Sequence, residues 1–291
     1  MDKTQKRATF FALLAAALYA VNSPFSKLLL EKIPATMMAA FLYLGAGAGL
    51  FLMGIIQRTA GKKEKEKPLT KKELPYTVGM VALDIAAPIF LMHGLTMTTA
   101  ANASLLNNFE IVATSVIALV IFKEAISKRL WCAIALVTLS SIILSFEDMS
   151  SLSFSYGSVF VLLACVCWGF ENNCTRMLSS KNPLEIVVIK GFGSGLGSLI
   201  IALVLGERAP ELLYVLCALL LGFVAYGLSI YFYIYAQRDL GAAKTSTYYA
   251  VAPFIGTALS LLIFWELPSV SFIIALAIMA VGTYLASTDT K

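Results

Sequence analysis

Four ionisable residues lie inside long apolar stretches of the sequence, where an unpaired charge is costly. They are Asp84, Glu110, Glu171 and Lys190. An ionisable group at membrane depth usually faces a cavity or a partner of opposite charge. Three acids beside one base could bind a cation, or exchange it for a proton. These residues are therefore the first candidates for a functional site.

Glu171 has the most informative surroundings. An aromatic, a polar and a hydroxyl side chain share one helical face at Trp168, Glu171 and Thr175, and the pattern recurs 149 residues earlier, at Tyr19, Asn22 and Ser26. We expect the two stripes to face each other, with both aromatic rings able to hold a cation. The alternative is a buried Glu171–Lys190 ion pair that only fixes two helices.

Glu110 and Asp84 are further candidates for a cavity. Glu110 shares a helical stripe with Ala103, Asn107 and Thr114. The alternative for Glu110 is a hydrogen-bonded strut to Asn or Ser of a neighbouring helix. Asp84 precedes Pro88 by one turn, and a proline there would open the helix beside the acid.

The elements that must position these residues are membrane-spanning helices. The chain of 291 residues is 59% hydrophobic and 13% charged, with a mean hydropathy of +0.83, which excludes an ordinary soluble domain. Ten apolar stretches approach the roughly 20 residues needed to cross a bilayer. They cover about 8–30, 35–57, 75–95, 99–121, 127–146, 156–178, 184–205, 211–237, 240–264 and 269–287.

An internal repeat organises these stretches. The segment 121–127 (IFKEAIS) recurs 142 residues later at 263–269 (IFWELPS). The repeat predicts two five-helix units, 1–149 and 150–291. In this alignment Glu110 corresponds to Ala252, next to the helix-breaking Pro253. Because five is an odd number, the second unit enters the membrane from the opposite side. Inverted repeats of this kind expose a central site alternately to the two sides.

Lysine and arginine set the orientation. With the N-terminus inside, 18 of the 22 basic residues fall in cytoplasmic segments and three fall outside. We therefore predict that both termini are cytoplasmic. The short loops favour the cytoplasmic (inner) membrane as the location. The net charge of +5 comes from loops near anionic lipid, and requires no nucleic-acid partner.

Two glycine-rich runs, 45–49 and 191–197, lie at comparable depths of the second and seventh spans and predict close helix packing. Five cysteines all fall inside predicted spans, where we expect them to fill the core and to form neither disulfides nor a metal site. With one histidine, no His-Glu-x-x-His and no Gly-x-Ser-x-Gly, an integral-membrane enzyme is the disfavoured class. We expect no cofactor.

The full pattern resembles the EamA-type branch of the drug/metabolite transporter superfamily. The resemblance rests on the ten spans in two inverted halves, on Trp168-Gly169 followed by Arg176, and on the Phe-x-Glu segments 122–124 and 264–266. It implies a bundle whose cavity is lined mainly by spans 1, 3, 4, 6, 8 and 9, with spans 5 and 10 peripheral. Glu124 and Glu266 match acids at span ends that look structural. Glu110-Ile111 stands where members often have a proline, which makes this cavity more acidic.

These features predict a proton-coupled exporter of a small cationic or zwitterionic organic solute, working by alternating access as a monomer or homodimer. Glu171 and Glu110 would exchange protons, and Asp84 would add negative potential. Tyr19, Trp168, Tyr226 and Tyr249 could provide aromatic walls, with Asn22 and Asn107 as polar contacts. Lys190 would either neutralise Glu171 or bind a carboxylate, so an amino-acid exporter or an anionic-metabolite exchanger remains an alternative.

Overall fold

The protein is an almost entirely helical, multi-pass membrane protein. The computed structural model describes residues 3–60, 67–123, 125–148, 153–178, 181–240, 245 and 248–288. Within this part of the chain, eight helical segments are long and apolar enough to cross a membrane. They are Thr4–Leu29, Ala35–Thr59, Lys71–Met97, Ala100–Ile121, Tyr156–Leu178, Pro183–Val204, Leu212–Ala236 and Val270–Ser287. The predicted span 127–146 corresponds to the shorter helix α7 (Lys128–Leu144), and α13 (Ala252–Phe264) covers the second part of the predicted span 240–264.

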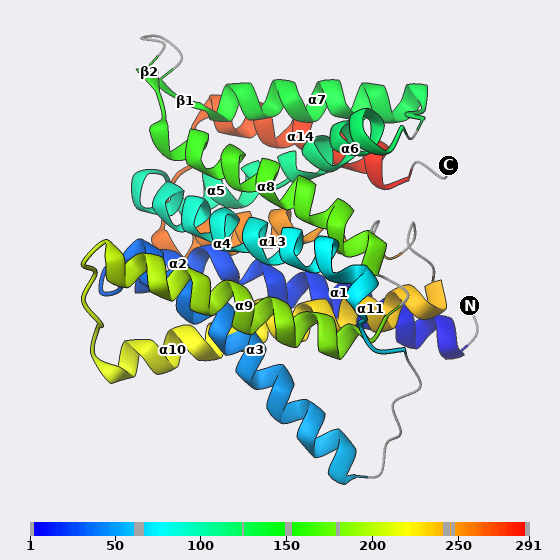
Figure 1. Ribbon diagram of the computed structural model, residues 1–291. Coiled ribbons are helices and arrows are strands. Elements are labelled where there is room, and N and C mark those ends of the chain that lie inside the picture. Colours follow the sequence, from blue (N-terminus) through cyan, green and yellow to red (C-terminus); the bar gives the residue numbers. More distant parts are fainter. Residues whose placement is uncertain are drawn as a thin grey trace.

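The helices lie roughly along one common direction, with both chain ends at the same end of the bundle (Figure 1). The first half contains α1 (Lys3–Ala20), α2 (Asn22–Leu29), α3 (Ala35–Thr59), η1 (Lys71–Glu73), α4 (Leu74–Met97), α5 (Ala100–Leu106), α6 (Phe109–Phe122) and α7 (Lys128–Leu144). A short antiparallel pair follows, β1 (Phe146–Asp148) and β2 (Ser153–Phe154), with Phe146 opposite Phe154.

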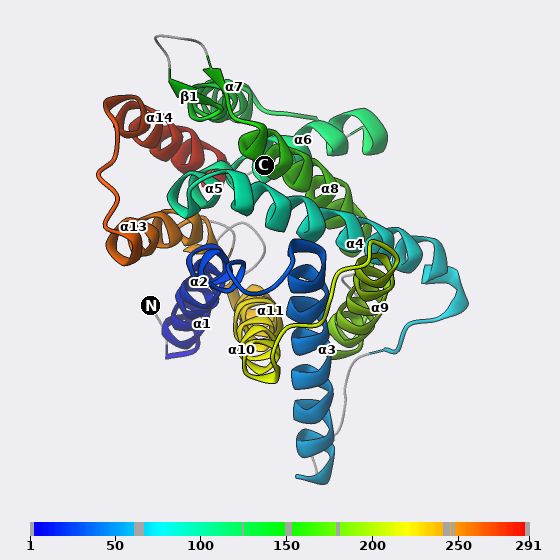
Figure 2. The same cartoon turned by 90° about the vertical axis from the view of Figure 1, so that its left-hand side faces the viewer.

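The second half contains α8 (Tyr156–Leu178), α9 (Pro183–Val204), α10 (Leu212–Gly222), the π-helix η2 (Phe223–Leu228), α11 (Ser229–Leu240), α13 (Ala252–Phe264) and α14 (Val270–Ser287). Seen along the bundle, α7 and α14 pack side by side at one edge, and α4, α5 and α8 separate them from α3 and α9 (Figure 2). The two predicted spans that correspond to α7 and α14 are therefore peripheral.

Two spans expected to be continuous are interrupted near their middle. The first has a turn at Val21 between α1 and α2, because Pro24 has no N–H group with which to continue the helical ladder. The fourth is broken at Asn107 and Asn108, where the Asn108 amide donates to the Leu105 carbonyl at 3.1 Å. Asparagine competes with helical bonding in this way. The stripe through Glu110 is therefore split between α5 and α6.

Matching caps stand 142 residues apart. Lys123 and Trp265 end α6 and α13 in the left-handed conformation, with φ of 57° and 54°. Ser127 and Ser269 then begin α7 and α14 as N-caps, each accepting a backbone N–H at 3.0 and 3.1 Å. The span ends named in the sequence thus share a local backbone structure. Glu124 lies outside the described residues.

The glycine runs bring α3 and α9 together, as predicted. A methyl group on Gly47 would lie 2.9 Å from the backbone nitrogen of Phe192, and one on Gly191 would collide with the Gly47 backbone. Only hydrogen side chains allow these two backbones to approach so closely. This contact holds α9, and with it Lys190, close to α3.

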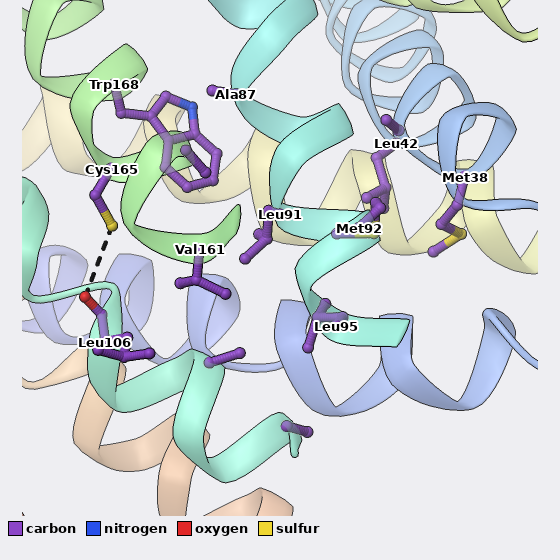
Figure 3. Close-up of a cluster of buried hydrophobic side chains, with 14 of the residues drawn as sticks. Met38, Leu42, Ala87, Leu91, Met92, Leu95, Leu106, Val161, Cys165 and Trp168 are labelled. Atoms are coloured by element: carbon purple, nitrogen blue, oxygen red, sulfur yellow. Dashed lines mark hydrogen bonds between the residues drawn. The ribbon is translucent and has the colours of Figure 1, made fainter. Parts of the chain in front are cut away.

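A continuous cluster of apolar side chains forms the core of the bundle. Figure 3 shows Trp168 and Val161 of α8 beside Ala87 and Leu91 of α4, with the Cys165 thiol directed at the Leu106 carbonyl. The expectation that all the cysteines fill the core is wrong. Cys132 and Cys217 are exposed on the outside of the bundle, where a small apolar side chain can face lipid.

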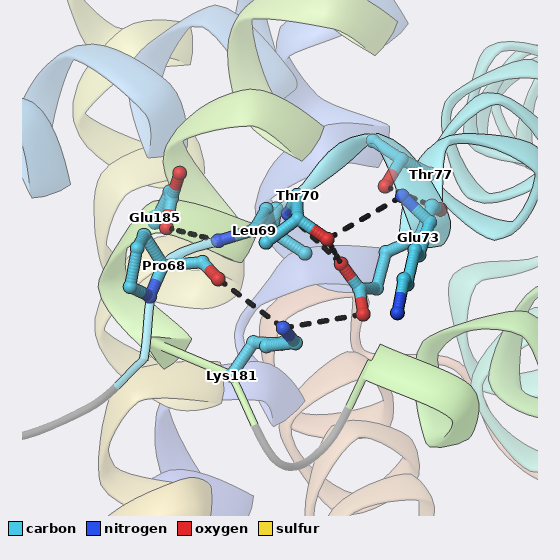
Figure 4. A network of polar contacts seen from close by, with 8 residues as sticks. Pro68, Leu69, Thr70, Glu73, Thr77, Lys181 and Glu185 are labelled. Carbon is cyan, nitrogen blue, oxygen red and sulfur yellow. Dashed lines mark hydrogen bonds and ion pairs between the residues drawn. The ribbon is translucent and has the colours of Figure 1, made fainter.

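A polar network fixes the start of α4. Lys181 pairs with Glu73 at 3.1 Å and donates to the Pro68 carbonyl at 3.3 Å (Figure 4). Glu185 accepts the Leu69 N–H at 3.0 Å, and Glu73 forms a capping box with Thr70. The network joins the segment before α4 to the connection between α8 and α9, the three helices that carry the central charges.

Candidate functional site

Lys190 bridges two acids in the interior of the bundle. Its ammonium nitrogen lies 3.0 Å from Asp84 Oδ2 and 3.0 Å from Glu171 Oε1. The three residues come from α9, α4 and α8, and they are 9%, 0% and 2% exposed, respectively. The predicted Glu171–Lys190 pair is present, and Asp84 joins it, a contact that the sequence pattern does not predict. With both acids ionised, this cluster carries one net negative charge.

Hydroxyl groups complete the coordination of both carboxylates. Tyr43 donates to Asp84 Oδ1 at 2.8 Å, and Thr175 donates to Glu171 Oε1. Thr175 belongs to the predicted stripe on α8, whereas Tyr43 was missed. Its signal was weak, since it is the one tyrosine in the Gly/Ala-rich second span. Lys190, Tyr43 and Thr175 together orient the two acids.

Replacing Tyr43 by phenylalanine should lower the free energy of unfolding by about 1.5–3 kcal/mol, because the ring stays while a buried charged acceptor loses one donor. Chemical unfolding in detergent would measure the change. The same substitution at Tyr214, near the start of α10, is the control and should have a smaller effect. Equal losses at both positions would contradict the assigned role of the Tyr43 hydroxyl.

Aromatic rings connect the two predicted stripes. Asn22 donates to the Tyr226 hydroxyl at 3.0 Å, and the ring of Tyr226 lies 5.1 Å from that of Tyr43. Tyr19 packs 6.0 Å from Tyr226 and 5.9 Å from Tyr249, measured between ring centroids. The stripe on α1 and α2 therefore reaches the acids through Tyr226 and Tyr43.

Glu110 occupies a neighbouring polar cluster. Its carboxylate accepts the Asn172 amide at 2.6 Å, and the same amide nitrogen lies 3.2 Å from the Thr114 hydroxyl. This is the hydrogen-bonded strut that was the alternative for Glu110. Asn172 was missed in the sequence, although it directly follows Glu171. Glu110 and the Lys190 cluster thus flank the same turn of α8.

Two further predicted residues lie at the edges of this region. Trp168 is 5% exposed and lies in the apolar cluster of Figure 3, one turn before Glu171. Asn107, 7% exposed, ends α5, and its amide oxygen has no hydrogen-bond partner among the described residues. In the same part of the chain, no group of three His, Cys, Asp or Glu side chains could hold a metal ion.

A separate cavity of about 540 Å³ opens between the ends of α2, α4, α13 and α14. Lys27 and Glu266 both line it, together with Asn102 and several hydroxyl side chains. The Lys27 ammonium donates to the Leu95 and Thr98 carbonyls, the latter at 2.9 Å, and so ties α2 to the end of α4. None of the predicted site residues lines this cavity.

The model of the EamA-like transporter family matches residues 6–146 and 155–288. The chain belongs to the EamA-like transporter family. It is therefore a transporter of the drug/metabolite transporter superfamily.

One relative is an uncharacterized transporter of Methanothermobacter thermautotrophicus. It is 24% identical over 293 residues, covering 95% of this chain and 85% of the relative. A solved structure described only as "Crystal structure of protein" superposes with a TM-score of 0.69, at 16% identity, over 96% of this chain and 95% of the other. That likeness concerns the fold alone.

Proposed function

We propose that this EamA protein is a proton-coupled exporter of a small cationic or zwitterionic organic solute, and that Asp84, Glu171 and Lys190 form its exchange site. The supporting observation is the single ammonium shared by two buried carboxylates. One positive charge cannot neutralise both acids. A proton or a substrate cation can provide the second positive charge.

The exchange follows from this charge balance. When the solute's cation approaches, the protonated carboxyl group of Glu171 releases its proton. The positive charge of the solute then takes the place of that proton. When the solute leaves, a proton returns, and the buried cluster is neutral again. Lys190 remains with Asp84 throughout. Glu110, whose carboxylate accepts the Asn172 amide, adds negative potential beside the site and is the second proton-exchange candidate.

Aromatic side chains supply the apolar part of the proposed site. Tyr19, Tyr226 and Tyr249 stack edgewise or tilted at centroid distances near 6 Å. Such rings attract a cation through their negative faces, most strongly where water is excluded. Asn22, Asn107 and Trp168 would contact the solute once the helices separate.

Alternating access would arise from two inverted five-helix repeats, 1–149 and 150–291, with ten spans and both termini in the cytoplasm. Supporting observations are the matching caps at a spacing of 142 residues and the location of both chain ends at one end of the bundle (Figure 1). The basic loops favour an orientation with both termini in the cytoplasm, and we place the protein in the cytoplasmic membrane. Monomer and homodimer are both compatible with this scheme.

A purely anionic solute fits the geometry less well, because Lys190 would have to leave both acids to bind it. An amino acid is different. Its carboxylate could contact Lys190 while its ammonium contacts Glu171. Amino-acid export is therefore the second candidate, and it depends on Lys190 as well as on Glu171.

A thermal-stability screen tests the proposal. The purified protein is measured with amines, quaternary ammonium compounds, amino acids and organic anions at two pH values. We expect organic cations to raise the unfolding temperature more at the higher pH, where fewer protons compete for the carboxylates. The Glu171→Gln variant should lose this stabilisation, and Glu31→Gln, at an exposed acid outside the site, should keep it.

Each class of stabilising ligand would support a different function. Stabilisation by amino acids that disappears in both Glu171→Gln and Lys190→Met would favour the second candidate. Stabilisation by anions alone, dependent on Lys190, would overturn the cation site. Cation binding that is intact in Glu171→Gln would do the same.

A further inference from the structure

Two interrupted spans pack against α13 near Gly256, outside the Lys190 cluster. The α13 helix packs against α1, α2 and α5, beside the interruptions at Val21 and at Asn107 and Asn108. A methyl group built on Gly256 would lie 3.0 Å from the Ala20 carbonyl oxygen and 3.1 Å from the Ser104 hydroxyl oxygen. Two oxygen atoms from different spans therefore lie beside Gly256, where α13 packs against the first and fourth spans.

The Ala20 carbonyl is available because of the neighbouring proline. Ala20 is the last residue of α1, and in a continuous helix its oxygen would accept the N–H of residue 24. That residue is Pro24, which has no N–H to donate. The negative end of the α1 dipole lies at the same carbonyl. The position is therefore favourable for a cation.

Ser104 is unusual among the buried serines of this bundle. Ser141 and Ser260 donate to the carbonyl four residues earlier, at 2.8 and 2.7 Å. Ser104 is 2% exposed, yet its hydroxyl has no hydrogen-bond partner among the described residues. A buried hydroxyl without a partner costs free energy unless a ligand supplies one. The amide oxygen of Asn107, three residues further along, is also buried without a hydrogen-bond partner among the described residues.

We propose that the Ala20 carbonyl, the Ser104 hydroxyl and the Asn107 amide oxygen bind a sodium ion. All three donors are neutral oxygens, which suit a hard monovalent cation, whereas calcium sites include carboxylates. Carbonyls at unwound helices coordinate sodium in secondary transporters. The ion would join the first and fourth spans beside the ninth, and it would add a second coupling cation to the proton exchange proposed at Glu171.

Sodium-dependent stability tests this site. The unfolding temperature of the purified protein is measured in saturating sodium chloride and in potassium or rubidium chloride of the same ionic strength. We expect sodium to raise it by about 3–6 °C over the larger ions. Ser104→Ala and Asn107→Ala should each reduce that shift by at least half. Ser198→Ala is the matched control, since Ser198 also has a buried hydroxyl without a described partner, but lies in α9.

The outcomes separate this site from the exchange site. Glu171→Gln should keep the sodium shift even where it loses stabilisation by organic cations. Equal stability in sodium and potassium, or a full sodium shift in Ser104→Ala, would overturn the sodium site. Loss of organic-cation stabilisation in Ser104→Ala, with no sodium effect in the wild type, would mean that these oxygens bind the solute instead.

Discussion

Replacing Lys190 by methionine should destabilise the protein by about 3–5 kcal/mol at neutral pH, the range measured when one partner of a buried ion pair is removed. Methionine keeps most of the side-chain volume, so the loss reports the charge. Asp84 and Glu171 would remain as two buried carboxylates without a shared cation. Chemical unfolding in detergent, with wild type and variant measured at each pH, gives the difference.

The loss should shrink as the pH falls. Protonation removes the charge of Asp84 and Glu171, and a neutral carboxyl group needs no ammonium partner. The difference between wild type and Lys190→Met is therefore largest at neutral pH and smallest in acid. A difference that stays constant across this range would mean that Lys190 acts through packing alone.

A combined variant provides the control for this charge argument. In Asp84→Asn/Glu171→Gln/Lys190→Met all three charges are gone, and most of the lost stability should return. Lys181→Met removes a more accessible ion pair with Glu73 and should change stability little. If the triple variant were less stable than Lys190→Met, the three groups would not form one electrostatic unit.

The sequence predicted the charged residues of the site better than their connections. Deep charges in apolar stretches are visible without a structure, and so is the pairing of Glu171 with Lys190, since both lie at similar depth. Asp84 was placed in a cavity, but its contact with Lys190 depends on how α4, α8 and α9 pack together. Sequence periodicity describes one helix at a time and carries no such information. Tyr43 and Asn172 were missed for the same reason.

Helix interruptions were also difficult to predict. The apolar stretches 8–30 and 99–121 remain apolar across Val21 and Asn107, so hydropathy shows no boundary there. The local causes are Pro24 in the first stretch and the Asn108 side chain in the fourth. The sequence predicts helix breaks at Pro88 and Pro253, but α4 continues through Pro88, and α13 begins one residue before Pro253. The interruption at Val21 follows the Ala20 carbonyl, which lies beside Gly256.

Transport driven by a pH gradient should fall by about a hundredfold in Glu171→Gln, the change expected from losing about 2.7 kcal/mol of interaction with a charged group. Glutamine preserves the size of the side chain and a hydrogen bond from Thr175. It carries no negative charge and binds no proton at physiological pH. The experiment uses proteoliposomes, an imposed pH gradient and an organic cation that stabilises the purified protein.

The comparison of two acids makes this experiment specific. Glu110→Gln should retain a larger share of transport than Glu171→Gln, because Glu110 has Asn172 as its partner whereas Glu171 shares Lys190 with Asp84. Exchange of labelled solute without a gradient should survive in a variant that still binds solute but has lost proton coupling. Equal gradient-driven transport in wild type and Glu171→Gln would place proton coupling elsewhere. A greater loss in Glu110→Gln would move the exchange site to the α6 side of α8.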